Sequence, residues 1–376
     1  MATDQKPEWS DPSNPDLCSS VVRKGEEHEV QATSLQKNTR FKKRNTQEIS
    51  VEELYCGVLN GNRSILARAI TLVESNADHH FQKAQELLQK LMPSTGNSIR
   101  IGITGVPGAG KSTFIEAFGE YLCSLDLKVA VLAIDPSSSI SGGSILGDKT
   151  RMEQLSRNSR AFIRPSPSAG KLGGVHRKTR ESILLCEAAG FDVILIETVG
   201  VGQSEVIIRD MVDFFMLLVL TGAGDELQGM KKGIMELADA IIVHKADGEN
   251  KPKAEKTRND YNRILHFLQP ATKGWMTKAH TCSSLTLEGI SGIWDMIQSF
   301  EQKGKDSGVF AERRKIQSRE WLYALISDQL HYHFYHHQGV KNLLPKIENE
   351  VIAGEKTVAS AVESLLKRFF IKEGNL

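Results

Sequence analysis

The chain has 376 residues, and its 47 Lys and Arg residues almost balance 46 Asp and Glu residues. This length predicts one large α/β domain with additions, or two to three structural units. A net charge of +1 argues against a protein that binds nucleic acid mainly by electrostatic attraction. No apolar run approaches the ~18 residues that a membrane-spanning helix needs. We therefore expect no nucleic-acid partner and no membrane.

The cysteines and the first residues bear on the compartment. The five cysteines form no Cys-x-x-Cys pair, which argues against a zinc knuckle or a disulfide framework and favours a reducing compartment. Residues 1–49 are rich in Pro, Ser, Asn and Gln and predict a disordered tail. The first 20 residues hold more acids than bases. A transit peptide has the opposite composition, so this start favours a cytoplasmic or already processed protein.

The rest of the chain divides by its apolar pattern. Residues 50–97 show apolar positions at helical spacing and predict an N-terminal helical segment. Between residues 98 and 304, short runs of Val, Ile and Leu alternate with helical stretches, which predicts a mainly parallel sheet covered by helices on both faces. Residues 305–376 predict a C-terminal helical extension. The predicted strands include residues 101–104, 129–134, 193–196, 214–220 and 240–243.

The first predicted strand is followed by a phosphate-binding loop. Residues 105–112 fit the pattern G-x-x-x-x-G-K-[ST], with an apolar strand before them and an amphipathic helix after them. Glycines let backbone N–H groups wrap the phosphates, Lys111 reaches the β- and γ-phosphates, and the Ser112 hydroxyl is a ligand for Mg²⁺. The predicted nucleotide contacts here are Gly105, Val106, Pro107, Gly108, Ala109, Gly110, Lys111, Ser112 and Thr113.

Acidic residues end two further strands. Asp135 follows one strand and Glu197 another, where each carboxylate can hold Mg²⁺ directly or through water. Residues 197–200 resemble the DxxG segment of GTPases with Glu in place of Asp, and Gly200 can donate its N–H to the γ-phosphate. A glycine-rich stretch that ends in Asp148 predicts a loop that orders around the nucleotide.

Two segments predict a guanine pocket. Residues 244–247, His-Lys-Ala-Asp, resemble the NKxD motif, in which the carboxylate of Asp247 accepts two hydrogen bonds that adenine cannot offer. Ser283, Ser284 and Leu285 resemble the loop that supports the guanine carbonyl. Histidine stands where the motif has asparagine, and whether His244 braces the neighbouring loops as asparagine does is left open.

Four longer stretches carry a family resemblance. Residues 68–75, 135–152, 197–205 and 224–229 resemble the MeaB/ArgK family of P-loop metallochaperone GTPases, which includes the methylmalonic aciduria type A group of animals. The resemblance covers residues 50–376. It implies a Mg²⁺-dependent GTPase that binds methylmalonyl-CoA mutase, gates the loading of adenosylcobalamin, and protects or reactivates the mutase. It also implies a homodimer joined through the C-terminal extension and, for animal members, the mitochondrial matrix.

The resemblance also assigns roles to residues. Lys111, Asp135, Asp148 and Glu197 form the implied catalytic set, and the three acids with Ser112 hold the metal. The implied switch residues are Gly200, Gln228 and Lys231. No direct cobalamin contact is expected. Since no Gln or Arg finger stands beside the phosphate loop, we predict slow intrinsic hydrolysis that a partner accelerates.

Three alternative interpretations fit parts of the sequence less well. A P-loop kinase or ATPase acting on a transport component needs a phosphoryl acceptor pocket and a base, whereas the sequence shows a guanine motif and switch loops. A nickel-delivery GTPase needs Cys and His ligand motifs near the nucleotide, and these are missing. Histidines 331, 333, 336 and 337 could bind metal, but we favour a polar and aromatic helix surface or a dimer contact.

Overall fold

The computed structural model describes residues 49–75, 77–135, 152–167, 172–198, 204–221 and 232–370. These residues belong to one compact unit, Ile49–Leu376. The predicted disordered tail, residues 1–49, lies outside the described residues apart from Ile49.

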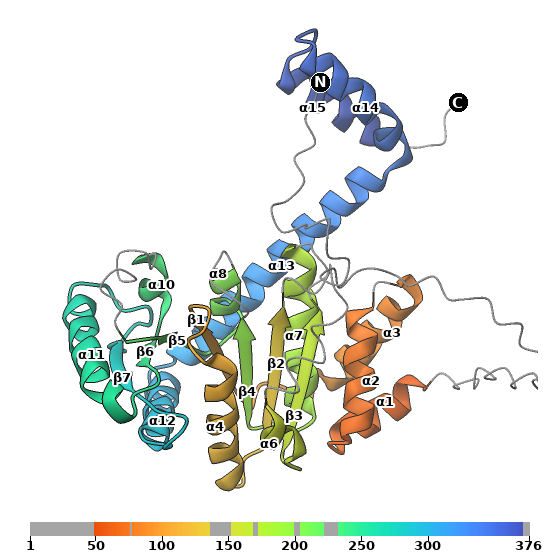
Figure 1. Ribbon diagram of the computed structural model, residues 1–376. Helices are drawn as coiled ribbons and strands as arrows, with labels where there is room; N and C mark the ends of the chain where they lie inside the picture. Colours follow the sequence, from red (N-terminus) through yellow and green to blue (C-terminus); the bar gives the residue numbers. More distant parts are fainter. Residues whose placement is uncertain are drawn as a thin grey trace, which may run out of the picture. The chain divides into compact units, whose positions relative to one another are not determined.

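A seven-stranded sheet with the order β3-β2-β4-β1-β5-β6-β7 lies at the centre of this unit (Figure 1). Every neighbouring pair of strands is parallel, which confirms the predicted α/β architecture. The strands are β1 (Ile99–Gly105), β2 (Val129–Asp135), β3 (Ala161–Pro167), β4 (Val193–Thr198), β5 (Phe214–Val219), β6 (Ala240–Val243) and β7 (Lys278–Thr281).

Strand β3 was not among the strands named from the sequence. It contains Arg164, Pro165 and Pro167, which hide the apolar pattern. Proline cannot donate to a hydrogen-bond ladder and is tolerated on an edge strand, where one side of the strand has no neighbour. β3 is the last strand of the sheet on its side, paired only with β2.

The sheet separates two hydrophobic cores because successive side chains of a strand point to opposite faces. In β5, all of which is buried, Phe214 and Met216 join one core, whereas Phe215 and Leu217 join the other. Helices α4 (Lys111–Ser124), α6 (Glu153–Arg157) and α12 (Ile290–Asp306) cover the first face. The second face is covered by α7 (Leu172–Ala188), α8 (Ser204–Arg209), α10 (Lys232–Leu237) and α11 (Lys251–Leu265).

The N-terminal helical segment packs on α7. It consists of α1 (Val51–Leu59), α2 (Arg63–Glu74), α3 (Asp78–Leu91) and the short η2 (Met92–Ser94), and the three α-helices contact α7. Helix α1 begins at a capping box, in which Ser50 and Glu53 satisfy each other's backbone N–H groups. Most of the predicted N-terminal helical segment, residues 50–97, is therefore helical.

The C-terminal segment is helical, as predicted. The long helix α13 (Val309–His336) packs on α12 and α7, and α14 (Gln338–Ile352) and α15 (Val358–Phe370) follow it. Helices α14 and α15 share a small separate core, in which Val340 and Leu365 are buried. Within the described residues, no helix has both the length and the apolar character that crossing a membrane requires.

Candidate functional site

The phosphate loop joins the end of β1 to the start of α4. A Cβ atom at Gly105 would lie 2.3 Å from the carbonyl oxygen of Leu218, so that position admits only glycine. Gly108 and Gly110 have φ values of 80° and 84°, in the left-handed region that glycine adopts readily. The glycines of the motif are therefore required by the backbone path, and that path delivers the chain to the N-terminus of α4.

Lys111 folds back over this loop. Its Nζ donates to the carbonyl oxygens of Gly105, at 2.8 Å, and Val106, at 3.3 Å. Burial lowers the pKa of Lys111, and the nearby Glu197 carboxylate opposes that shift. Among the described residues, this ammonium group donates only to backbone carbonyls, so a nucleotide phosphate would be a stronger partner for it.

Ser112 and Glu197 meet beside the loop. The Ser112 hydroxyl donates to Oε1 of Glu197 at 3.1 Å, and Glu197 is buried. The register pairs Ile103 of β1 with Glu197 of β4, which brings the acid to the same edge of the sheet as the loop. A hydroxyl and a carboxylate are the hard oxygen ligands that Mg²⁺ prefers, so these residues fit the metal.

The remaining acidic and switch residues lie in less fully described parts of the chain. Asp135 is the last residue of β2, which neighbours β4, so its backbone also ends at this edge. The other predicted residues, Asp148, Gly200, Gln228 and Lys231, lie outside the described residues.

His244 connects the phosphate loop to the loop that follows β7 and contains Ser283, Ser284 and Leu285, called the base-side loop below. It follows β6, and its buried ring places Nδ1 2.7 Å from the carbonyl oxygen of Ala109 and Nε2 2.7 Å from the hydroxyl of Ser284. A Cβ atom at Gly110 would lie 2.9 Å from this ring. The ring also contacts Phe114 of α4 edge to face. The bracing contact that the sequence left open is therefore present, with histidine making it.

Asp247 and Ser283 lie together on the base side. The Ser283 hydroxyl donates to Oδ2 of Asp247 at 2.6 Å and accepts the backbone N–H groups of Leu285 and Thr286, each at 3.2 Å. Ser283 is fully buried, whereas Leu285 is 80% exposed. The structure thus brings the two predicted guanine-pocket segments into contact through this hydrogen bond and through the contact of His244 with Ser284.

Sequence reasoning missed Asn250, which holds the turn after β6. Its Nδ2 donates to the carbonyl oxygen of Lys245 at 2.6 Å, and its Oδ1 accepts from Thr221 at 2.7 Å. Lys245 has a φ of 58°, unusual for a residue with a side chain. The sequence feature that could have identified Asn250 is the Gly-Glu-Asn run of η3 (Gly248–Asn250). Asparagine is frequent in turns because its side chain hydrogen-bonds to nearby backbone groups.

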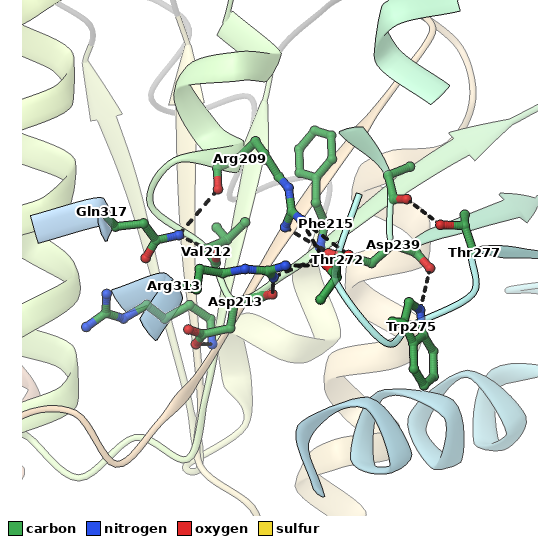
Figure 2. A network of polar contacts seen from close by, with 12 residues as sticks. Arg209, Val212, Asp213, Phe215, Asp239, Thr272, Trp275, Thr277, Arg313 and Gln317 are labelled. Atoms are coloured by element: carbon green, nitrogen blue, oxygen red, sulfur yellow. Dashed lines mark hydrogen bonds and ion pairs between the residues drawn. The ribbon is translucent and has the colours of Figure 1, made fainter. Parts of the chain in front are cut away.

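A buried polar network lies at the edge of the sheet opposite the phosphate loop, where α8, β5 and β6 meet α13 (Figure 2). Arg209, the last residue of α8, donates to Oδ2 of Asp239 at 2.8 Å, and Thr272 donates to the same carboxylate. Arg313 of α13 contacts Thr272 and lies 3.8 Å from Asp239. Arg314 makes two hydrogen bonds to Asp213, at 2.8 and 2.6 Å. Buried carboxylates are thus paired with arginines from distant elements.

The histidine cluster lies at the C-terminal end of α13. His331, His333 and His336 are exposed, and His336 lies 2.8 Å from the carbonyl oxygen of Tyr332 through Nδ1. Their rings contact neighbouring tyrosines rather than one another. Among the residues that the structure describes, no group of three or more His, Cys, Asp or Glu side chains is arranged to hold a metal ion.

Comparison with known proteins agrees with this geometry. A model of the family described as "Methylmalonyl Co-A mutase-associated GTPase MeaB" matches residues 66–339. A protein of Caulobacter vibrioides named "Putative GTPase" is 51% identical over 85% of this chain and 98% of its own length. The "Methylmalonic aciduria type A homolog, mitochondrial" of Mus musculus is 44% identical over 85% of this chain and 79% of its own length.

A solved structure is also similar. "Crystal structure of LAO/AO transport system kinase" is 38% identical, covers 84% of this chain and 96% of its own, and superposes with a TM-score of 0.69. This similarity over most of both chains supports the fold.

Proposed function

Because the chain belongs to the MeaB family of GTPases, we propose that it gates the loading of adenosylcobalamin into methylmalonyl-CoA mutase and protects or reactivates that enzyme. The observation that carries the proposal is the match of residues 66–339 to a family described by its association with the mutase. It is supported by a phosphate loop whose glycines have the conformations that the motif requires and whose Ser112 contacts Glu197.

In this proposal the chain binds GTP and lets water attack the γ-phosphate. Lys111 leaves its two carbonyl partners and binds the β- and γ-phosphates, while Asp247 accepts the N–H groups of guanine. Ser112 and Glu197, together with Asp135 and Asp148, would hold Mg²⁺. When bound, Mg²⁺ neutralises phosphate charge that develops during hydrolysis. The side chains of the protein position the nucleotide and select guanine over other bases.

We also propose a homodimer and a compartment. Helices α13 and α15 expose apolar side chains, as expected of a surface that a second copy covers.

The name of the mouse relative includes the word mitochondrial, so we propose that this protein is located in the mitochondrial matrix, with the cytoplasm as the alternative. Microscopy of the full-length protein with a C-terminal fluorescent tag distinguishes the two.

The test is GTP hydrolysis by the full chain, measured as phosphate release with and without methylmalonyl-CoA mutase. We expect slow turnover alone and an increase on the order of tenfold or more when the mutase is added, because a partner orders the switch segments. Lys111→Ala should lower the stimulated rate by ~100-fold or more. Lys273→Ala, which removes an exposed lysine, is the matched control. An equal rate with and without the mutase would contradict the proposed role.

A second candidate is phosphoryl transfer to a transport component, because the similar solved structure is described as a transport system kinase. The same assay separates the two functions if the GTP carries label in its γ-phosphate. Hydrolysis releases the label as inorganic phosphate, whereas a kinase leaves it on a protein or a small acceptor.

A further inference from the structure

The chain leaves strand β6 through a bulge at Lys245. The carbonyl oxygen of Val243, the last residue of β6, accepts the N–H of Cys282 at 3.0 Å, so the backbone of Val243 faces β7. Alternate residues of a strand face the same neighbour, so in a regular ladder the next N–H toward β7 belongs to Lys245. Instead, the N–H of Ala246 donates to the carbonyl oxygen of Cys282, at 3.0 Å. Lys245 is therefore an extra residue, as in a β-bulge.

This bulge decides which way the next side chains point. The φ of Lys245 is 58°, in the left-handed region, which is unfavourable for a residue with a side chain. A shift of one residue turns the side chains that follow to the opposite side, because side chains alternate along an extended segment. The direction of Asp247 therefore depends on the conformation of Lys245. With the bulge in place, Oδ2 of Asp247 reaches the hydroxyl of Ser283 at 2.6 Å.

Asn250 satisfies the carbonyl oxygen of the extra residue. Its Nδ2 donates to the carbonyl oxygen of Lys245 at 2.6 Å, and its Oδ1 accepts from the hydroxyl of Thr221 at 2.7 Å. A carbonyl oxygen only accepts, so the nitrogen of the amide must face Lys245 and the oxygen must face Thr221. Both ends of the amide are used, and its orientation is thereby determined.

The position of Asn250 makes this use of its side chain unusual. Asn250 directly precedes α11, where an asparagine side chain commonly accepts the first N–H groups of the helix. Within the described residues 232–370, its side chain makes no such bond to α11. It reaches instead to Thr221, two residues beyond the end of the buried strand β5. The turn after β6 is thus anchored to the central sheet through this one amide.

We propose that Asn250 is a specificity-determining positioning residue of the GTPase, which holds Lys245 in the left-handed conformation and thereby sets the direction of Asp247. It acts through these two residues rather than on the nucleotide. The inference rests on the proposed function, in which Asp247 accepts the N–H groups of guanine. Without Asn250, guanine should lose its advantage over a base that lacks the exocyclic amine.

The test compares the binding of GDP and IDP to the full chain by calorimetric titration with Mg²⁺ present. Both nucleotides lack a γ-phosphate, so no turnover occurs, and they differ only in the exocyclic amine that hypoxanthine lacks. We expect the wild type to bind GDP about tenfold more tightly than IDP, since IDP leaves an oxygen of Asp247 without its donor. Asp247→Ala should bind the two nucleotides equally, which checks the role of Asp247 separately.

Variants of Asn250 then test its role in this preference. Asn250→Ala should lower the preference for GDP from about tenfold to about twofold or less. Asn250→Asp keeps an acceptor for Thr221 but cannot donate to Lys245, so we expect the same loss. Asn259→Ala removes an exposed asparagine of α11 and is the matched control. A general loss of stability or of phosphate affinity would weaken both nucleotides alike and leave their ratio unchanged.

A second substitution should rescue the first. Glycine adopts the left-handed conformation without support, so the double variant Lys245→Gly/Asn250→Ala should regain the preference of about tenfold. Any contact that the Lys245 side chain makes with both nucleotides cancels in the ratio. Thr221→Val removes the hydroxyl that holds the other end of the amide and should lower the preference about threefold. The unfolding midpoint of each variant checks that it folds.

The experiment separates failure of this inference from failure of the guanine pocket. Equal preferences in the wild type and in Asp247→Ala would refute the guanine role of Asp247, and this inference with it. Loss of the preference in Asp247→Ala but not in Asn250→Ala would overturn this inference alone. A double variant that stays without the preference would overturn it as well.

Discussion

At the scale of single residues, His244 is the position where the sequence differs from the usual guanine motif, which has asparagine there. The carbonyl oxygen of Ala109 only accepts, so Nδ1 must carry the proton. In the neutral ring Nε2 then accepts from the Ser284 hydroxyl. Burial lowers the pKa of His244, which favours this neutral form. One imidazole thus joins the phosphate loop to the base-side loop, and only glycine at position 110 leaves room for it.

We predict that His244→Ala weakens GTP binding by about tenfold or more, because the carbonyl oxygen of Ala109 and the hydroxyl of Ser284 both lose their partner. Titration with a fluorescent GTP analogue measures the affinity, and thermal unfolding reports the accompanying loss of stability. His266→Ala removes an exposed histidine and should leave both unchanged. Wild-type affinity in His244→Ala would show that the two loops hold their positions without the brace.

At the scale of elements, the attachment of α13 is polar. In α13, which is described throughout, Gln317 is the one buried side chain. The helix is held through Arg313, Arg314 and Gln317, which reach the turn between α8 and β5 and the start of β6. This network lies at the starts of β1, β5 and β6, which is the edge of the parallel sheet opposite the phosphate loop (Figure 2).

We predict that Asp213→Asn lowers the free energy of unfolding by about 3–5 kcal/mol. The substitution leaves the buried charge of Arg314 without its carboxylate, and breaking one partner of a buried pair is strongly destabilising. Urea unfolding measures the change. Asp306→Asn, at the exposed end of α12, is the matched control and should change the value by less than about 0.5 kcal/mol. Equal stabilities of the two variants would contradict a structural role for the Asp213 pair.

At the scale of the whole molecule, the C-terminal helices α13 and α15 expose large apolar side chains to solvent. On α13, Leu322, Ile326 and Leu330 recur every four residues and are 57%, 45% and 60% exposed. On α15, Val358 and Val362 recur in the same way and are 67% and 50% exposed. Positions four apart lie on one face of a helix, so each helix presents an apolar stripe that suits a protein interface.

We predict that the full chain is a dimer and that Ile326→Glu makes it a monomer, because the substitution places a charge in the centre of the apolar stripe. Light scattering coupled to size-exclusion chromatography measures the mass. Leu125→Glu changes an apolar residue that is equally exposed, at 45%, but lies at the end of α4. A monomeric wild type, or a dimer that survives Ile326→Glu, would be evidence against this interface.

Local sequence patterns were sufficient to predict much of the fold and the phosphate loop of this protein. The alternation of apolar runs and helical stretches predicted the parallel sheet and the helical ends, because strand and helix periodicities are properties of short segments. Glycine spacing predicted the phosphate loop in the same way, since the conformations at Gly108 and Gly110 depend on the lack of a Cβ atom. Strand β3 was not predicted because its prolines and arginine interrupt the apolar pattern of a strand.

Pairings between distant side chains could be seen only in the tertiary structure. His244 meets a carbonyl 135 residues earlier in the chain, and Arg314 meets a carboxylate 101 residues earlier. Arg180 of α7 reaches the carbonyl oxygen of Gln317 and the ring of Trp321 only because α7 packs against α13. Such contacts depend on strand order and helix packing across the whole sheet, and no periodicity within a short segment encodes which distant residue will lie opposite.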